Sequence, residues 1–418
     1  MKKTALGAVA LALTSTTALA GGIERSVIDY GVLFQPGTQL TFSTALVSPK
    51  VSGTYDAALG GGSTGNMAEN YASYGFSYKN QFTDKLAFAL YNNDAYGADA
   101  LYTQGAYTGL TATWDSNQTA AMLRYQVADR ISVYGGVRYV RSSAEILIPD
   151  QMIRPSVQSQ LTDGVTQLQN AQAALAGLGQ GAGDAQYDTV TAQLQATQTR
   201  LAQANAAPFG TFTYTADSNV DGQFGYVLGA AYEIPDIALR VGLTWESAIT
   251  HKFDTNEALA GAGLNATTQT EIEMPQSVAL DFQSGVAAGT LVFGQVKWTE
   301  WSKWEVRTPG YEAFSGDAVT GIDNDTWTYR LGIGRKFSDS VSGFAQVTYE
   351  PSNGAVASRL SPTDGKISFG IGGQVTEGNM KMRGGIEYVK LGDATDASGT
   401  KFKGNSAIGM GLSFTVSF

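Results

Sequence analysis

Apolar and polar residues alternate strictly along the last segment of the chain. Apolar side chains stand at every second position, namely Ile408, Met410, Leu412, Phe414, Val416 and Phe418, and glycine, serine and threonine fill the positions between them. Period-two alternation is typical of a β-strand with one apolar and one small or polar face. Because the ends of soluble domains are usually polar, a chain that stops on a bare apolar residue indicates an apolar surrounding beside this strand.

The same alternation recurs along the chain, and the connectors between such segments are alternately short and long. The expected strands lie near residues 38–47, 73–81, 84–92, 109–127, 130–148, 210–233, 237–253, 270–284, 289–304, 321–337, 340–350, 364–376, 379–391 and 402–418. An even number of strands with short turns on one side and long loops on the other is the plan of a bacterial outer-membrane barrel, whose short turns face the periplasm. A soluble two-sheet sandwich also alternates, but it gives no reason to place every long connector at one end. The pattern therefore predicts an all-β membrane protein, a 14-stranded antiparallel transmembrane β-barrel over residues 38–418.

The residue types on the two faces of these strands agree with a barrel in lipid. On one strand Leu239, Val241 and Leu243 alternate with Arg240 and Thr244, so the apolar face is expected to meet lipid and the polar face the lumen. Charged residues expected in the lumen are Arg124, Arg138, Arg240, Lys297, Arg330, Lys381, Arg383, Glu246, Glu273, Asp281 and Glu387. Two interpretations stay open. The charges pair with one another and stiffen the lumen, or Arg138, near Arg141, binds the carboxylate head of a ligand.

One long connector, residues 149–209, breaks the strand pattern. From residue 156 to 207 apolar residues recur every three or four positions, and a glycine-rich stretch at 177–184 divides them. This spacing predicts two amphipathic helices, a hairpin above the barrel at its extracellular end. Its apolar positions include Leu161, Val165, Leu168 and Leu175. They serve either to pack a purely structural cap or to provide an apolar surface that captures ligand.

The start of the chain and its composition place the protein. Residues 1–20 combine Lys2 and Lys3 with an apolar stretch and a small-residue end, which is typical of a secretory signal peptide. The chain carries 27 Lys and Arg against 37 Asp and Glu, a net charge of −10, so nucleic acid is not an expected partner. With no cysteine, disulfides are excluded as a source of stability.

Single residues suggest no enzyme, cofactor or metal site. His251 is the only histidine, and it is expected at the surface near the end of a strand, so a Ser-His or metal-ligand set has little to use. Trp298, Trp301 and Trp304 are expected in the aromatic girdle at the lipid headgroup level.

Several segments resemble the FadL family of outer-membrane transporters for long-chain fatty acids and other hydrophobic compounds. They are VYGGVRYVRSSAEI at 133–146, DGQFGYVLGAAYEIPDIALRVGLTWESAITHKF at 221–253, EMPQSVALDF at 273–282, VKWTEWSKW at 296–304 and YRLGIGRKFSDSVSGFAQVTYEPS at 329–352. The resemblance implies a 14-stranded barrel with an N-terminal plug, lateral exit of ligand through the wall, and no energy source. The plug is short, because only residues 21–37 precede the first strand, and PheGlnProGly at 34–37 replaces the Asn-Pro-Ala motif of the family. A basic residue expected shortly before the Tyr329-Arg330 pair is also absent, which implies weaker carboxylate specificity.

These observations predict a passive transporter in the outer membrane of a Gram-negative bacterium. Its expected ligand is a long-chain fatty acid or another hydrophobic small molecule, captured at extracellular loops and released into the outer-membrane lipid. The ligand-binding residues expected from the sequence are Leu161, Val165, Leu168, Leu175, Arg138 and Arg141. Phe418 is expected to be read by the outer-membrane assembly machinery. The alternative function is a general aqueous porin.

Overall fold

A computed structural model describes residues 22–354 and 356–418 of the protein, so the expected signal peptide lies outside the described residues. The strands are β1 (Gln39–Lys50), β2 (Gly53–Thr54), β3 (Tyr71–Gln81), β4 (Leu86–Asn93), β5 (Gly97–Leu101), β6 (Thr111–Ala128), β7 (Ile131–Ile148), β8 (Tyr214–Ser218), β9 (Asp221–Ile234), β10 (Leu239–Glu246), β11 (Ile249–Leu259), β12 (Leu264–Met274), β13 (Ser277–Ala287), β14 (Thr290–Thr299), β15 (Glu305–Val306), β16 (Thr320–Gly321), β17 (Thr326–Lys336), β18 (Val341–Glu350), β19 (Lys366–Glu377), β20 (Met380–Leu391), β21 (Ala394–Thr395), β22 (Lys401–Phe402) and β23 (Ser406–Ser417). The helices are α1 (Asp150–Gly177), α2 (Ala185–Ala206) and α3 (Pro309–Ser315), with short 3₁₀ helices η1 (Tyr30–Phe34), η2 (Ala57–Leu59), η3 (Gly105–Tyr107), η4 (Pro235–Ile237), η5 (Ala260–Ala262) and η6 (Trp301–Lys303).

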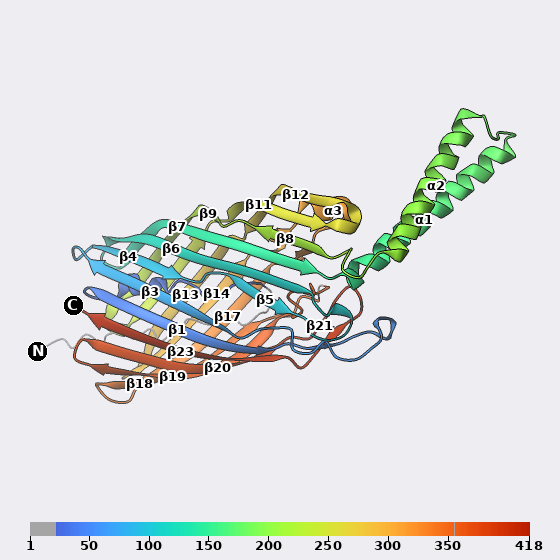
Figure 1. The fold of residues 1–418 in the computed structure, drawn as a ribbon. Helices are drawn as coiled ribbons and strands as arrows, with labels where there is room; N and C mark the ends of the chain where they lie inside the picture. The colour runs from blue at the N-terminus through green and yellow to red at the C-terminus, as the bar shows by residue number, and fades with distance from the viewer. Residues whose placement is uncertain (1–21, 355) are drawn as a thin grey trace, which may run out of the picture.

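Fourteen of the strands in the described residues form a closed antiparallel ring (Figure 1). Its order is β1, β3, β4, β6, β7, β9, β10, β13, β14, β17, β18, β19, β20 and β23. The last strand closes against the first, with Gln39 opposite Ser417 and Lys50 opposite Ser406. Closure leaves no sheet edge in lipid, where unpaired backbone groups have no water to bind. The predicted 14-stranded barrel is thus confirmed.

Side chains on the two faces of the wall divide as the alternation predicts. Leu243 is 52% exposed, whereas the next residue, Thr244, is 3% exposed. In β23, Ile408, Met410 and Leu412 are all about half exposed on the outer face, and Ser413 lines the interior. Exposed apolar residues on a closed barrel form a band that suits lipid.

Three neighbouring strand segments are interrupted at the extracellular end of the ring. The breaks lie at residues 219–220, 247–248 and 275–276, and beyond them β8, β11 and β12 extend the sheet, with β8 paired to the ring strand β7. Inward positions are even-numbered in β10 but odd-numbered in β11, because each break shifts the alternation by one residue. The prediction of a surface position for His251 is therefore wrong: the side chain is completely buried. Glu273, expected in the lumen, lies instead on the face of β12 opposite the buried Ile272 and Met274.

Trp301 and Trp304 also differ from expectation. Strand β14 ends at Thr299, and η6 turns the chain inward, so both indoles are buried in an apolar cluster rather than placed in the girdle. Trp298 remains in the barrel wall, opposite Trp327.

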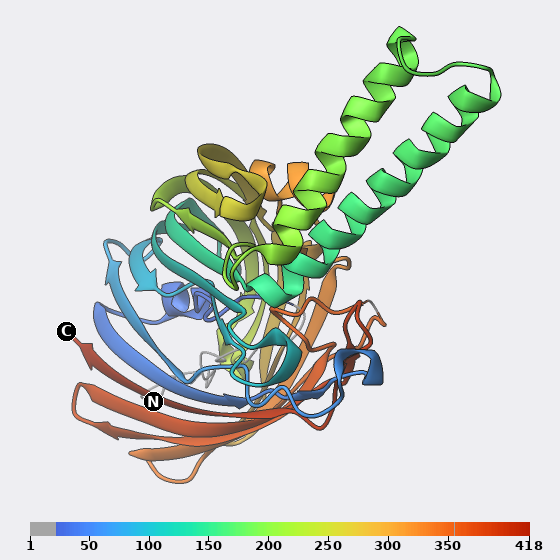
Figure 2. The same cartoon turned by 45° about the vertical axis from the view of Figure 1, so that its right-hand side comes forward.

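The helical loop forms an antiparallel hairpin that projects away from the extracellular end of the barrel (Figures 1 and 2). No helix in the described part of the chain is both long and apolar enough to cross a membrane. The base of the hairpin is fixed by the buried carboxylate of Asp150, which accepts hydrogen bonds from Arg154 and from the backbone N–H groups of Gly210 and Phe212. Burial acts to raise the pKa of Asp150, but these hydrogen bonds outweigh it and lower the pKa.

Candidate functional site

The N-terminal segment, residues 22–37, lies inside the barrel and fills part of its lumen. Its short helix η1 buries Leu33 completely. The ring of Phe34 lies between two guanidinium groups of the wall, with the Arg124 carbon 4.6 Å and the Arg240 carbon 4.7 Å from the ring centre. The Lys79 ammonium donates to the carbonyl oxygens of Gln35 and Gly37 at 2.6 and 2.8 Å. We call this segment the plug.

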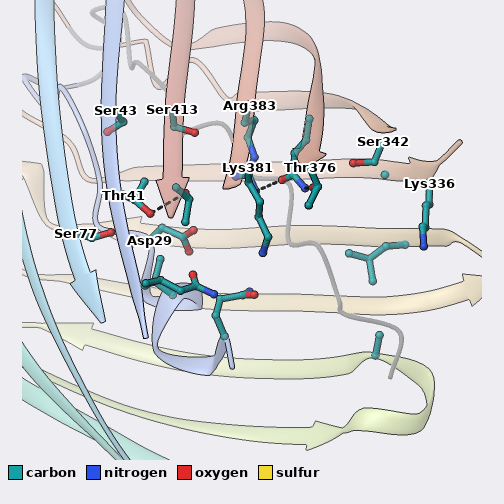
Figure 3. A pocket seen from close by; sticks show the side chains of 18 of the residues that line it. Asp29, Thr41, Ser43, Ser77, Lys336, Ser342, Thr376, Lys381, Arg383 and Ser413 are labelled. Carbon is teal, nitrogen blue, oxygen red and sulfur yellow. Dashed lines mark hydrogen bonds between the residues drawn. The ribbon is translucent and has the colours of Figure 1, made fainter. Parts of the chain in front are cut away.

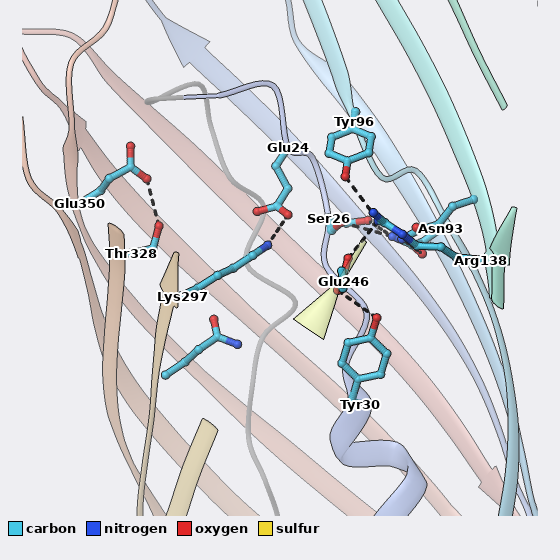
Figure 4. Close-up of polar contacts among 12 residues, drawn as sticks. Glu24, Ser26, Tyr30, Asn93, Tyr96, Arg138, Glu246, Lys297, Thr328 and Glu350 are labelled. Atoms are coloured by element: carbon cyan, nitrogen blue, oxygen red, sulfur yellow. Dashed lines mark hydrogen bonds and ion pairs between the residues drawn. The ribbon is translucent and has the colours of Figure 1, made fainter. Parts of the chain in front are cut away.

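Buried ion pairs tie the plug to the wall (Figure 4). Arg138 is 1% exposed, and its Nη1 lies 2.9 Å from Oε2 of Glu246. The other oxygen of Glu246 accepts a 2.9 Å hydrogen bond from the hydroxyl of Tyr30 in the plug. Lys297 forms an ion pair with Glu24 of the plug. Buried charges in this geometry are costly to separate, so these contacts stabilise the plug in the position seen here.

The barrel wall is interrupted beside the first residues of the plug. Strands β3 and β4 stay paired as far as Gly75 and Asn93, and pairing resumes at the bridge between Ala68 and Ala100. Between these points residues 70–73 face residues 95–98, and the described chain forms no backbone hydrogen bond between these two stretches. We call this gap the window.

The plug covers the window from inside. The N–H of Gly97 donates to the carbonyl of Ile23 at 2.8 Å, and the N–H of Arg25 donates to the carbonyl of Ala95 at 2.8 Å. Glu24 and Tyr96 form the bridge between these two bonds. In a continuous wall the backbone groups of residues 95–97 would pair with β3, whereas here the plug binds two of them, the carbonyl of Ala95 and the N–H of Gly97.

The Arg25 side chain seals the window. Its guanidinium carbon lies 4.3 Å from the centre of the Tyr71 ring, and it forms an ion pair with Asp99. Gly97 permits this packing, because a Cβ atom at that position would lie 2.2 Å from Nε of Arg25. The small void that remains here has a volume of only about 10 Å³, so the window is closed.

An apolar cluster extends from the extracellular loops to the window. It contains Trp114, Trp301 and Tyr96, and the partly buried Tyr71 and Ala98 pack against it. The ring of Tyr96 meets that of Trp301 edge to face, with 6.2 Å between centroids. The cluster gives an apolar lining to the route between the outer surface and the window.

The six residues expected to bind ligand do not meet at one place. Leu161, Val165, Leu168 and Leu175 are partly buried positions on successive turns of α1, and the same face contacts α2, since Gln172 donates to Thr191 at 2.7 Å. Arg138 is in the lumen and paired with Glu246, whereas Arg141 is exposed on the opposite face of β7. Ligand binding by these residues stays a prediction.

Sequence reasoning missed the residues of the window, Arg25, Tyr71, Gly97 and Asp99. A signal was present in the stretch NNDAYGADA at 92–100, where two asparagines, two aspartates and a glycine interrupt the alternation of a strand. Such residues are depleted in strands. The partner of this stretch is far away in sequence, so the contact with Arg25 had no local signature.

Comparisons with known proteins agree with this architecture. A family model described as "Outer membrane protein transport protein (OMPP1/FadL/TodX)" matches residues 33–395. A Pseudomonas aeruginosa FadL homologue superimposes with a TM-score of 0.65 at 13% identity, covering 93% of this chain and 92% of that one. The Pseudomonas putida toluene transporter TodX gives 0.60 at 14% identity and 96% coverage of both chains, and the CymD monoaromatic hydrocarbon channel gives 0.54 at 16% identity, covering 93% and 90%. None of the curated proteins compared matches this chain.

The match over most of the chain defines the class: this is an outer-membrane transport protein of Gram-negative bacteria, built as a closed 14-stranded barrel. The chain belongs to the OMPP1/FadL/TodX family. The resemblance to the FadL family that the sequence motifs indicate is confirmed.

Proposed function

We propose that this protein is a passive transporter that takes long-chain fatty acids or other hydrophobic compounds from its extracellular loops and releases them through the window into the outer membrane. The observation that carries the proposal is the gap between β3 and β5, which in the described residues is closed by the plug, chiefly by its residue Arg25. Two proteins with a similar fold are a toluene transporter and a monoaromatic hydrocarbon channel. Their names support a hydrophobic compound as the ligand.

The driving force is partition from water into an apolar route. Each CH₂ group that leaves water contributes about 0.8 kcal/mol, and the apolar cluster beside Tyr96 and Trp301 provides the surface. The membrane lipid that receives the hydrocarbon is as apolar as the cluster. The hydrocarbon therefore moves from the cluster into the lipid without an energy source.

Opening of the window requires a shift of the plug. Ligand in the apolar cluster competes with Ile23, which belongs to that cluster, and displacing Ile23 moves the neighbouring Glu24 and Arg25. Movement of Arg25 breaks its contacts with Tyr71 and Asp99. The gap in the wall is then covered by lipid alone.

The alternative, a general aqueous porin, fits these features less well. A porin needs a wide polar channel through the barrel. In the described residues the plug and the apolar cluster lie across the lumen, and the charges near them are paired, as in Arg138–Glu246 and Lys297–Glu24.

A reversible tether of the plug tests the proposal. Glu24 and Tyr96 form a non-hydrogen-bonded antiparallel pair, in which Cα atoms are about 4.5 Å apart, close enough for a disulfide. The chain has no cysteine of its own, so Glu24→Cys with Tyr96→Cys gives a single bond. We expect uptake of a radiolabelled monoaromatic hydrocarbon by cells to fall to background when the bond forms and to recover with reductant.

The reduced double variant is the matched control, because it carries the same two substitutions. A second test removes the guanidinium that seals the window, and we expect Arg25→Ala to speed uptake. Arg130→Ala, at an exposed periplasmic turn, is the matched control for loss of an arginine. Equal uptake by the oxidised and reduced forms would show that the plug does not move, and it would overturn release through the window.

A further inference from the structure

A second cavity lies on the periplasmic side of the plug. It has a volume of about 710 Å³ and extends from the plug residues Val27, Ile28 and Val32 to the periplasmic turns near residues 285–289 and 338–340. Volumes of this order hold small-molecule ligands. This cavity shares no lining residue with the void at the window, so the two are separate. We call it the vestibule.

One wall of the vestibule is cationic and rich in hydroxyl groups (Figure 3). Lys381 and Arg383 take successive inward positions on β20. Their cross-strand neighbours are neutral: Lys381 stands opposite Thr376 and Thr415, and Arg383 stands opposite Gln374 and Ser413. No carboxylate stands directly opposite either cation, and Arg383 donates from Nη2 to Oε1 of Gln374 at 3.1 Å.

Lys381 differs from the other interior cations of the barrel. Arg124 lies 2.7 Å from Glu233, and Lys297 pairs with Glu24. Lys381 points from β20 into the vestibule (Figure 3), and the described chain gives it neither a hydrogen bond nor an ion pair. Cations enclosed in a protein are normally paired, so this position is suited to an anion that arrives from outside the chain.

The opposite wall of the vestibule is apolar. The plug presents Val27, Ile28 and Val32 to the cavity. Its single carboxylate there, Asp29, accepts a hydrogen bond from the N–H of Gly31 at 2.8 Å and is near enough to Arg383 to favour the charged form of that guanidinium. A ligand that satisfies both walls has a negatively charged head and a hydrocarbon body.

We propose that the vestibule is a binding site for an amphipathic monocarboxylate, with its carboxylate on Lys381 and Arg383 and its body against Val27, Ile28 and Val32. Carboxylate oxygens accept charge-assisted hydrogen bonds from ammonium and guanidinium groups. An inorganic phosphate would satisfy the cations but leave the apolar wall in water. The proposal deepens the transport function, on which it rests, by giving the anionic members of the proposed ligand class a second site on the periplasmic side of the plug, separate from the window.

Binding is measured on the purified full mature chain in lipid nanodiscs, with octanoate as the probe and 1-octanol as its neutral counterpart. Ser413 lines the vestibule, and Ser413→Cys gives one thiol in a chain without cysteine. We expect a negatively charged methanethiosulfonate reagent to modify this thiol faster than a positively charged one, and octanoate to slow the reaction more than octanol does.

Two variants locate the site. In the Ser413→Cys background, Lys381→Gln or Arg383→Gln should weaken protection by octanoate about tenfold, the change that corresponds to loss of one charge-assisted hydrogen bond. Lys401→Gln, at an exposed position of the extracellular strand β22, is the matched control and should leave protection as it was. Heat-dependent gel mobility confirms that each variant is a folded barrel.

Equal protection by octanol and octanoate would reduce the vestibule to an apolar cavity and overturn the proposal. Unchanged octanoate affinity in both Lys381→Gln and Arg383→Gln would do the same. Because this assay includes no transport step, its failure is distinct from failure of the window, which is scored by hydrocarbon uptake in cells.

Discussion

On the ring strands, the face on which a side chain lies was predictable from its odd or even position in the alternation. Beyond the strand breaks it was not. The alternation in β10 correctly places Leu243 outward and Thr244 inward. The same parity carried into β11 puts His251 on the wrong face, because the break at residues 247–248 shifts the register. Ser247 and Ala248 give no local warning of a break. The break becomes evident from the partner strands, since β10 pairs with β9 whereas β11 pairs with β8 and β12.

The buried His251 forms a polar row with two partners. Its Nδ1 lies 2.9 Å from Oδ2 of Asp221, and its Nε2 lies 3.1 Å from Oγ of Ser142. Because a carboxylate only accepts, Nδ1 carries the proton and Nε2 accepts from the hydroxyl. The order of groups is that of a serine hydrolase, but Ser142 is 2% exposed within a paired strand. The row therefore holds β7, β9 and β11 together.

This row predicts a pH effect on the extracellular sheet. Burial lowers the pKa of His251, although the hydrogen bond with Asp221 acts in the opposite direction. A lowered folded pKa means that the neutral form stabilises the sheet fully above the unfolded value of 6.5, and that this stability is lost as the pH falls through the folded pKa. Below pH 6.5 we expect the equilibrium constant for opening of β11 to increase by up to about tenfold per pH unit. Hydrogen exchange, corrected for its intrinsic rates, measures this opening. His251→Gln should abolish the dependence, and a variant that keeps it would assign the effect to other groups.

At the scale of elements, helical periodicity predicted the hairpin well but not its direction. The expected helices over residues 156–207 agree with α1 and α2, because an amphipathic repeat depends only on local spacing. The hairpin projects away from the barrel instead of covering it (Figure 2). That direction is set at its base, where Asp150 binds Gly210 and Phe212, residues about sixty positions later in the chain.

The hairpin also provides a test of ligand capture by its apolar face. Leu161, Val165 and Leu168 lie on the face that packs against α2, so binding by them requires the helices to separate. A Cβ atom at Gly164 would lie 3.5 Å from Cγ2 of Thr197, an atom whose place Sγ can take in a cysteine at 197, so the two positions suit a disulfide. We expect the oxidised Gly164→Cys, Thr197→Cys variant to take up ligand several-fold more slowly, with full recovery in reductant. Equal uptake by the oxidised and reduced forms would show that Leu161, Val165 and Leu168 have a purely structural role.

For the whole molecule, strand number, closure and membrane were predictable, but the state of the lumen was not. Even counts of alternating strands with loops of two lengths determine the barrel. Whether residues 21–37 close it depends on contacts between distant parts of the chain. One such contact is the packing of the Phe34 ring between Arg124 and Arg240, and another is the ion pair between Glu24 and Lys297.

Removal of the plug therefore has an expected electrical result. The intact protein in a planar bilayer should show small, infrequent conductance, because the plug lies across the lumen. Deleting residues 22–37 should give a large, steady conductance. The deletion removes two carboxylates, Glu24 and Asp29, and one cation, Arg25, but leaves Lys381 and Arg383 in the lumen. The lumen therefore gains one net positive charge, and clefts with an excess of one sign of charge concentrate counter-ions. The open channel should therefore prefer anions, and Lys381→Gln with Arg383→Gln in the deleted chain should reduce that preference. A deleted chain that folds as a barrel but conducts no more than the intact protein would show that the extracellular apolar cluster alone closes the lumen.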